Sequence, residues 1–280
     1  MLAEAADDRP TIVVKPSSRW VPLNLRSVWE YRELLYFLTW RDVKVRYKQT
    51  AFGAAWALIQ PFMMMVVFTI FLGHLAGVSS EGKPYPLFSF SALVPWTFFS
   101  SSLSATANSL VGGGNLVSKV YFPRVILPIA SAGAYLVDFV LALGLLAAMM
   151  IWYGVAPGWG IVLLPVLTLL ALLAALAVGF WLAALNVRYR DVRYAVPFLM
   201  QLWLFASPVA YAASLVPHRW RLVYSLNPMA GVVEGFRWAM VGTPAPSAGT
   251  IAVSTAATLV VLVSGLAYFR KVERTFADLI

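Results

Sequence analysis

The sequence has no cysteine and few charged residues. Only 12% of its 280 residues are Asp, Glu, Lys or Arg, whereas 61% are hydrophobic. A soluble domain carries about 25% charged residues, so this chain has too little polar surface to cover a water-soluble globule. The lack of cysteine excludes a disulfide framework and a thiolate metal site. The composition therefore predicts a membrane protein.

The chemical groups that an enzyme needs are also scarce. The only histidines, His74 and His218, lie far apart in the sequence, and each is typical of a solvated or helix-end residue rather than a metal ligand. The sequence shows no cluster of acids and no nucleophile beside a base. Residues 113–119, GGNLVSK, do not meet the phosphate-loop pattern G-x-x-x-x-G-K-S/T. We therefore expect no catalytic, metal or cofactor-binding site in this chain.

Long uncharged stretches give a count of membrane spans. A transmembrane helix needs about 20 mainly apolar residues, and clusters of glycine and proline near residues 112–114, 154–160 and 242–249 divide or end the stretches. The sequence therefore predicts an all-α polytopic membrane protein with six transmembrane helices. The expected spans are about 53–77, 87–111, 126–152, 160–186, 195–213 and 250–269.

The lysines and arginines fall mostly on one side of these spans. Seventeen of the 21 lie in the N-terminal segment, the second and fourth loops and the C-terminal tail, and only Lys83, Arg219, Arg221 and Arg237 lie in the other loops. Cytoplasmic loops carry the excess of basic residues. We therefore expect both termini on the cytoplasmic side of the membrane. The net charge of +9 then reflects topology and contact with anionic lipid, and implies no nucleic acid partner.

Three further segments have a distinctive composition. Residues 214–243 are rich in apolar and aromatic side chains, which favours short re-entrant helices between spans five and six over a solvated loop. Residues 28–48 mix aromatic and charged side chains, as an amphipathic interface helix does, although their periodicity is imperfect. We expect residues 1–23 to be a disordered cytoplasmic lead-in and residues 24–280 to form one transmembrane domain.

One acid and several aromatic residues are candidates for function inside the membrane. Asp138 is either a carboxylate paired between helices near one end of the third span, or the coupling site of an ion-driven carrier. Most aromatic residues are typical of the belts at membrane interfaces, but flat rings also offer apolar faces to the C–H bonds of sugars. The candidates for lining a conduit are Trp56, Phe62, Phe68, Trp203, Phe205 and Tyr211.

An ordered set of segments resembles the landmarks of ABC-2 type permeases. These segments are Arg46–Gly53 with Trp56 and Pro61, Lys119–Arg124 with Pro128, Arg188–Asp191, Ser207–Val209, and Asn227–Met229 followed by Glu234 and Arg237. No single segment is specific, and the order of the whole set from about residue 24 carries the resemblance. The branch it resembles most exports O-antigen, capsular polysaccharide and teichoic acid. One departure is Phe52, where leucine is expected.

The resemblance implies a function and a set of partners. A member of this family would lie in the bacterial inner (plasma) membrane, as a homodimer of this chain with two copies of a cytoplasmic ABC ATPase, which would bind ATP and Mg²⁺. The substrate would be a lipid-linked glycan, as in lipopolysaccharide biosynthesis. This chain would be a permease subunit without enzymatic activity of its own.

The resemblance also implies roles for single residues. Coupling to the ATPase would involve Arg46, Tyr47, Lys48, Lys119, Phe122, Pro123 and Arg124, and the alternative is that these residues only orient the chain in the membrane. An exit gate would involve Asn227, Pro228, Glu234 and Arg237, and the alternative is simple re-entrant packing. Within the gate, we expect Asn227 and Pro228 to begin a short helix and Glu234 to pair with Arg237 one turn later.

Other classes of membrane protein remain as alternatives. An ABC-2 exporter of a small amphiphile, such as a drug or a lipid, would have the same fold. A secondary carrier is disfavoured because Asp138 is alone and no repeated halves are visible. A membrane glycosyltransferase or acyltransferase is disfavoured because the chain lacks a catalytic constellation.

Overall fold

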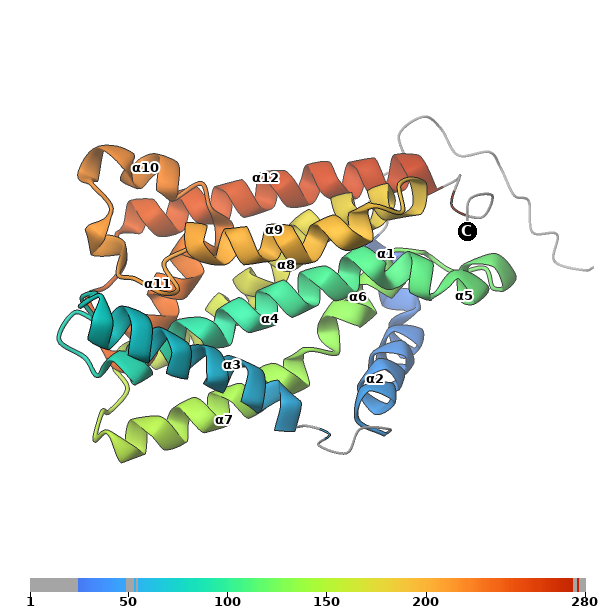
Figure 1. Ribbon diagram of the computed structural model, residues 1–280. Helices are drawn as coiled ribbons and strands as arrows, with labels where there is room; N and C mark the ends of the chain where they lie inside the picture. The colour runs from blue at the N-terminus through green and yellow to red at the C-terminus, as the bar shows by residue number, and fades with distance from the viewer. Residues whose placement is uncertain (1–24, 49–52, 54, 274–275, 277–280) are drawn as a thin grey trace, which may run out of the picture.

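The computed structural model describes residues 25–48, 53, 55–273 and 276, and this part of the chain is helical, without a β-strand. Figure 1 shows an elongated bundle of helices. The longer helices are α2 (Arg32–Lys48), α3 (Ala55–Phe68), α4 (Tyr85–Gly112), α7 (Leu136–Trp152), α8 (Leu164–Arg188), α9 (Val192–Ala206), α11 (Pro228–Val241) and α12 (Ala248–Val272). The shorter ones are α1 (Leu25–Glu30), α5 (Gly114–Lys119), α6 (Ile126–Gly133), α10 (Arg221–Tyr224), the π-helix η1 (Thr69–Leu75), and the 3₁₀ helices η2 (Trp159–Leu163), η3 (Ala213–Leu215) and η4 (His218–Trp220).

Helix α4 forms the centre of the bundle. It packs against α3, α6, α7, α8, α9 and α11, and most of its side chains are buried. Many of these are serine and threonine, whose hydroxyl groups bond to their own helix. The Ser91 hydroxyl donates to the Phe88 carbonyl oxygen at 2.9 Å, and the Thr106 hydroxyl donates to the Ser102 carbonyl oxygen at 2.7 Å. A polar sequence is tolerated here because protein, rather than lipid, surrounds the helix.

Small residues allow α8 and α12 to pack closely. A Cβ atom added at Gly265 in α12 would lie 2.6 Å from the carbonyl oxygen of Ala177 in α8, so no larger residue fits without a shift of the backbone. Small residues at such crossings favour helix association where no hydrophobic driving force exists between helices. The stacked rings of Trp181 and Tyr268, with centroids 4.5 Å apart, extend the same contact.

Four helical stretches are long and apolar enough to cross a membrane, at residues 55–75, 126–152, 159–188 and 248–272. Their limits lie within three residues of four of the expected spans. The second of these stretches, 126–152, is interrupted between α6 and α7, at Ala134 and Tyr135. The second expected span corresponds to α4, which has 28 residues but a less apolar sequence. The glycines near residue 112 end this helix, as the sequence predicts.

The fifth expected span, 195–213, is α-helical only as far as Ala206. Helix α9 stops at Ala206 because Ser207 adopts an extended conformation with φ −108° and ψ 154°. A residue before proline is biased away from the helical region, and Pro208 follows. The helix expected across residues 28–48 is likewise divided, into α1 and α2, with Tyr31 between them.

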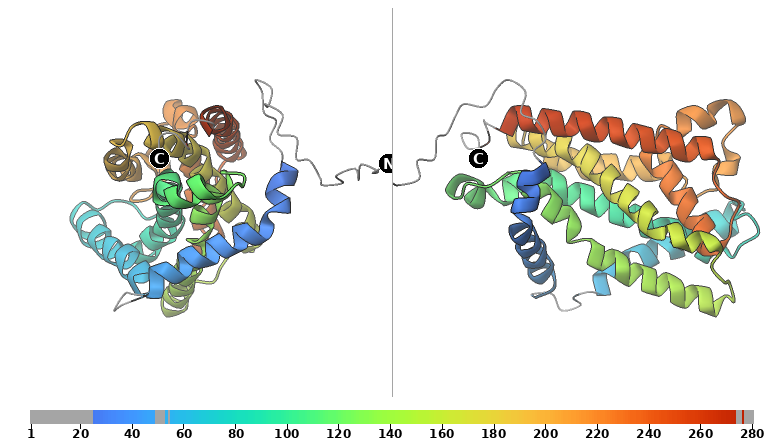
Figure 2. Two further views of the ribbon diagram at one scale, coloured as in Figure 1. Left: turned by 90° about the vertical axis from the view of Figure 1, so that its right-hand side faces the viewer. Right: turned by 180° about the vertical axis from the view of Figure 1, so that it is seen from behind.

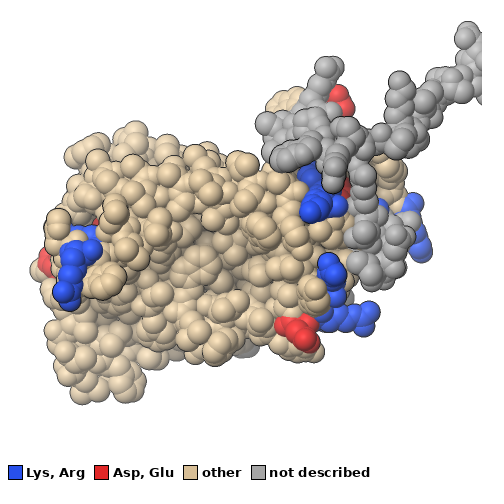
Figure 3. All heavy atoms as spheres, turned by 90° about the horizontal axis from the view of Figure 1, so that it is seen from above, with Lys and Arg blue, Asp and Glu red and all other residues tan. Residues whose placement is uncertain are grey.

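The two ends of the bundle differ in charge. Helices α2 and α5, the junction of α8 with α9, and the last turn of α12 lie at one end, which we call the basic end (Figures 1 and 2). The segment 76–84, η3, η4 and α10 lie at the opposite end, which we call the short-helix end. Figure 3 shows lysine and arginine at both ends of the visible face, with a broad belt free of charge between them. Among the described residues, the short-helix end holds only Lys83, Arg219, Arg221 and Arg237 as lysine or arginine.

Candidate functional site

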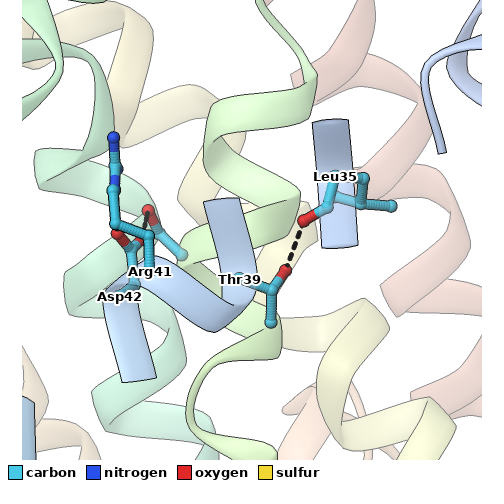
Figure 4. Close-up of polar contacts among 5 residues, drawn as sticks. Leu35, Thr39, Arg41 and Asp42 are labelled. Carbon is cyan, nitrogen blue, oxygen red and sulfur yellow. Dashed lines mark hydrogen bonds and ion pairs between the residues drawn. The ribbon is translucent and has the colours of Figure 1, made fainter. Parts of the chain in front are cut away.

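Helix α2 crosses the basic end and is attached to the bundle by one side. Leu38 and Val43 are buried against it, with exposed fractions of 2% and 7%. Asp42 accepts hydrogen bonds from Arg41 beside it at 2.8 Å and from Ser131 in α6 at 3.4 Å, whereas Thr39 donates to the Leu35 carbonyl oxygen of its own helix (Figure 4). Elsewhere on α2, large side chains are exposed, namely Tyr36, Phe37, Trp40 and Val45. Trp29 of the preceding helix α1 is exposed as well.

The last turn of α2 is bound to Asp138 near the start of α7. The Arg46 Nη1 atom lies 2.8 Å from Asp138 Oδ2, and the Tyr47 hydroxyl donates to Asp138 Oδ1. The Arg46 guanidinium also lies 3.5 Å from the centre of the Tyr135 ring. Burial, reinforced by the bond to Asp138, raises the pKa of Tyr47, which keeps its proton for this bond. Asp138 is therefore paired between helices, as the first of its two interpretations predicts.

A cavity of about 260 Å³ lies beside this cluster, between α2, α3, α4 and α7. We call it the inner cavity. Its lining includes Arg46, Tyr47, Trp56 and Asp138, which the sequence assigns to three different roles. Among the residues predicted for ATPase coupling, Arg46 and Tyr47 thus face the bundle, and Lys48 is exposed to the outside.

The segment between α5 and α6 is held by the end of α12. The backbone N–H of Arg124 donates to Glu273 Oε1 at 3.2 Å, and the Arg124 guanidinium donates to the Glu273 carbonyl oxygen. Glu273 Oε2 also lies 3.3 Å from Arg270 Nη1. Sequence reasoning missed Glu273. The available signal was a single acidic residue among the basic residues Arg270, Lys271 and Arg274.

A hydrophobic cluster lies under the same segment. Phe122 has an exposed fraction of 5%, and Phe269 and Phe276 are fully buried beside it. The rings of Phe269 and Phe276 meet edge to face, with centroids 5.2 Å apart. In contrast, Lys119 and Tyr121 are exposed. Phe122 and Arg124 therefore fix the segment to the bundle, and neighbouring side chains remain accessible at its surface.

At the short-helix end, Asn227 joins the end of α9 to the start of α11. Its Oδ1 atom accepts from the Met229 backbone N–H at 3.0 Å and from the Trp203 indole N–H at 2.9 Å. Its Nδ2 atom donates to the Ala206 carbonyl oxygen at 3.2 Å and to the Ser207 hydroxyl at 2.9 Å. Asn227 is the N-cap of α11 and Pro228 its first residue, as predicted.

The predicted ion pair between Glu234 and Arg237 does not form. Arg237 is buried, with an exposed fraction of 3%, and it donates to the carbonyl oxygens of Phe88 at 3.2 Å, Tyr211 at 3.0 Å and Val209 at 2.5 Å. These carbonyl groups offer better-placed acceptors than a carboxylate one turn away. Its guanidinium also lies 3.7 Å from the centre of the Phe88 ring.

Glu234 instead lines a second cavity, of about 280 Å³, which we call the outer cavity. Arg221, Tyr224 and Arg237 line it as well. Burial raises the pKa of Glu234 to about 7, and the charge of Arg237 opposes this shift. The carboxyl group can therefore change its protonation state near neutral pH.

The predicted conduit aromatics fall into different environments. Phe68 lies in the core with an exposed fraction of 4%, packed against other side chains of the bundle. Trp203 and Tyr211 are partly buried and hydrogen-bonded, Trp203 to Asn227 and Tyr211 to the Phe205 carbonyl oxygen. Phe62 is partly buried against the core. Only Trp56 and Phe205 are strongly exposed, at 55% and 56%.

A bundle of long apolar helices with a basic end defines a multi-pass α-helical membrane protein. The described residues contain no group of three or more His, Cys, Asp or Glu side chains arranged to hold a metal ion. Helix α3 also carries a polar residue in the inner cavity that sequence reasoning missed, Gln60. Its position inside an otherwise apolar stretch was the available indication.

Comparisons with known proteins then define the family. Residues 33–241 match the family model of the ABC-2 type transporter. The chain is 32% identical over 257 residues to the O-antigen export system permease protein RfbA of Myxococcus xanthus, covering 91% of this chain and 98% of that protein. It is 24% identical to the protein of the same name from Klebsiella pneumoniae, over 89% of this chain and 95% of that protein. It is also 21% identical to the polysialic acid transport protein KpsM of Escherichia coli, over 83% and 91%. The chain belongs to the ABC-2 type transporter family, as a membrane-spanning permease subunit.

Proposed function

We propose that this chain is the membrane-spanning subunit of an ATP-driven exporter that moves a lipid-linked polysaccharide, such as O-antigen, out of the cytoplasm. The observation that carries the proposal is the similarity to an O-antigen export permease along nearly the whole of both chains. The working unit is a homodimer of this chain with two copies of a cytoplasmic ABC ATPase. ATP and Mg²⁺ bind to that ATPase, and the chain itself contributes no nucleotide site.

Six transmembrane spans and two cytoplasmic termini fit the proposal. To the four long apolar stretches we add α4 and α9. At 1.5 Å per residue, α4 is about 42 Å long, which exceeds the roughly 30 Å of the hydrocarbon core. Helix α9 is shorter, and the segment Ser207–Tyr211 completes its crossing. Because cytoplasmic loops carry the excess of lysine and arginine, the basic end faces the cytoplasm.

The basic end offers a surface for the ATPase. The segment 119–124 lies there between α5 and α6, fixed by Phe122 and Arg124 and exposed at Lys119 and Tyr121. Helix α2 lies at the same end with Lys48 exposed, and in this proposal it runs along the membrane surface. Movement of the ATPase on binding ATP is transmitted through these two elements. The bundle then has two conformations, and nucleotide binding shifts the equilibrium between them.

The short-helix end contains the exit gate. Helix α11 is tied to α9 through Asn227 and to α4 through Arg237, so a shift of α9 or α4 also displaces α11. The glycan passes between two copies of the chain, and the exposed aromatic side chains Trp56 and Phe205 are the candidates left for contact with it.

ATP hydrolysis by the reconstituted complex tests this function. The chain is co-purified with its ATPase, placed in lipid vesicles, and supplied with the lipid-linked glycan extracted from membranes of the cells that produce it. We expect this glycan to stimulate hydrolysis and to appear on the far side of the vesicle membrane. No stimulation by the glycan, together with stimulation by small amphiphiles, would instead identify an exporter of drugs or lipids.

A further inference from the structure

The inner cavity holds hydrogen-bonding groups that the protein itself leaves unused. Gln60 of α3 and Ser101 of α4 both line it. Within the described residues, neither side chain makes a hydrogen bond, whereas the hydroxyl of Thr97 beside them is bonded to the Leu93 carbonyl oxygen at 2.8 Å. In the low-dielectric surroundings of a membrane bundle, free amide and hydroxyl groups favour a polar ligand.

The charge of the cavity is balanced. Among the described residues that line it, the charged ones are Arg46 and Asp138, which pair at 2.8 Å, so the carboxylate already neutralises the arginine. A phosphate or pyrophosphate group is recognised through unpaired cations and charge-assisted bonds. The cavity therefore suits an uncharged ligand better than the phosphate of a lipid carrier.

The walls also supply flat apolar faces. Trp56 has an exposed fraction of 55%, and the rings of Phe98, Tyr135 and Phe139 contribute to the lining. A sugar ring presents hydroxyl groups around its edge and C–H bonds on its faces. An aromatic platform beside free hydrogen-bonding groups matches both features at once.

The volume limits how much of a ligand fits. At about 260 Å³ the inner cavity lies below the roughly 300–1,000 Å³ of sites that hold drug-sized molecules. One sugar ring with part of a neighbour fits this space, and a polymer or a polyprenyl chain does not. The cavity also lies near the basic end, where a substrate enters from the cytoplasm.

From these observations we propose that the inner cavity is an entry subsite for one uncharged sugar unit of the exported glycan. Gln60 and Ser101 bond to its hydroxyl groups, and Trp56 covers one of its faces. The Arg46–Asp138 pair, with Tyr47, holds α2 and α7 together as the wall of the subsite. This assignment rests on the proposed polysaccharide export, and it adds the place and the chemistry of recognition.

The test compares substrate affinity in matched variants. Gln60→Leu and Trp56→Ala complexes with the ATPase are reconstituted, and hydrolysis is measured against increasing amounts of the lipid-linked glycan extracted from the producing cells. Trp152→Ala is the control, because Trp152 is exposed at the opposite end of α7. We expect Gln60→Leu to raise the half-saturating concentration about three- to tenfold through the loss of one hydrogen bond. Trp56→Ala should raise it at least as much, and Trp152→Ala should match the wild type.

A competition experiment separates sugar from phosphate. The glycan released from its lipid should compete with the intact substrate, and Gln60→Leu should weaken that competition. Undecaprenyl pyrophosphate without sugar should compete equally in the wild type and in Gln60→Leu. A variant effect on the pyrophosphate instead of the glycan overturns the proposal, as does an unchanged half-saturating concentration or a change confined to the maximal rate. If the glycan fails to stimulate even the wild-type complex, the polysaccharide function fails as well.

Discussion

Individual polar side chains bond to backbone carbonyl groups where the helical structure ends after α9. The carbonyl oxygens of Ala206, Val209, Ala210 and Tyr211 have no helical partner. Asn227 takes the first, Arg237 takes the second and the fourth, and the Tyr85 hydroxyl donates to the third at 2.7 Å. Irregular backbone at membrane depth persists only where such partners replace water. Arg237 and Asn227 therefore stabilise the structure of the proposed gate, independently of any role in its movement.

Replacing Asn227 tests this role. Asn227→Ala removes four hydrogen bonds, and at about 0.5–1.5 kcal/mol each the free energy of unfolding should fall by roughly 2–6 kcal/mol. Asn227→Asp keeps an acceptor for the Met229 N–H and the Trp203 indole, so its loss should be smaller. Both values come from denaturant unfolding of the purified chain in detergent, with Ser79→Ala at an exposed loop position as the control. Equal stability of Asn227→Ala and the control would contradict the assigned role.

Among the helices and their connections, the segment 119–124 acts together with the end of α12. Arg124 contacts Glu273 through both its backbone and its side chain, and Phe122 packs in the cluster that contains Phe269 and Phe276. A force on this segment is therefore passed directly to α12, which packs along α8. The contact joins two elements 149 residues apart in the sequence.

Breaking the contact should uncouple ATP hydrolysis from transport. Arg124→Ala removes the bond to the Glu273 carbonyl oxygen, and Glu273→Ala removes the bonds to the Arg124 N–H and to Arg270. We expect export by reconstituted vesicles to fall at least about fivefold in each variant, with more loss in Arg124→Ala because its side chain also loses its fixed position. Arg193→Ala, which deletes the same charge from an exposed position at the basic end, should export normally. Normal export and normal stimulation of the ATPase in Arg124→Ala would refute the coupling role.

The sequence predicts the elements better than their partners. Helix limits follow from local features, such as the glycines after Val111 or the cap at Asn227, and these fall where expected. The partners of Asp138, Arg124 and Arg237 lie 92, 149 and up to 149 residues away, so no local pattern identifies them. The i, i+3 rule misplaced the partner of Arg237, because that rule describes exposed helices and not a buried side chain surrounded by free carbonyl groups.

For the molecule as a whole, the distribution of charge implies an orientation in the membrane. Helix α2, the segment 119–124, the α8–α9 junction and the end of α12 gather the lysine and arginine side chains at one end, and few lie at the other. Figure 3 shows a broad belt without charged side chains between the two charged ends of the visible face, as is typical of a bundle that spans a membrane. In the proposed orientation, the short-helix end faces outward, with the outer cavity and the proposed gate.

The absence of cysteine allows this orientation to be measured directly. Single cysteines are introduced at Ser79, in the exposed segment after η1, and at Arg190, in the exposed connection between α8 and α9. In intact spheroplasts, a membrane-impermeant maleimide should label Ser79→Cys and leave Arg190→Cys unlabelled, and permeabilisation should expose Arg190→Cys. The wild-type chain, which has no thiol, serves as the blank, and retained export shows that each variant is folded. Labelling of Arg190→Cys from outside would reverse the orientation, and with it the assignment of the inner cavity to substrate entry, because the basic end would then face away from the ATP that drives transport.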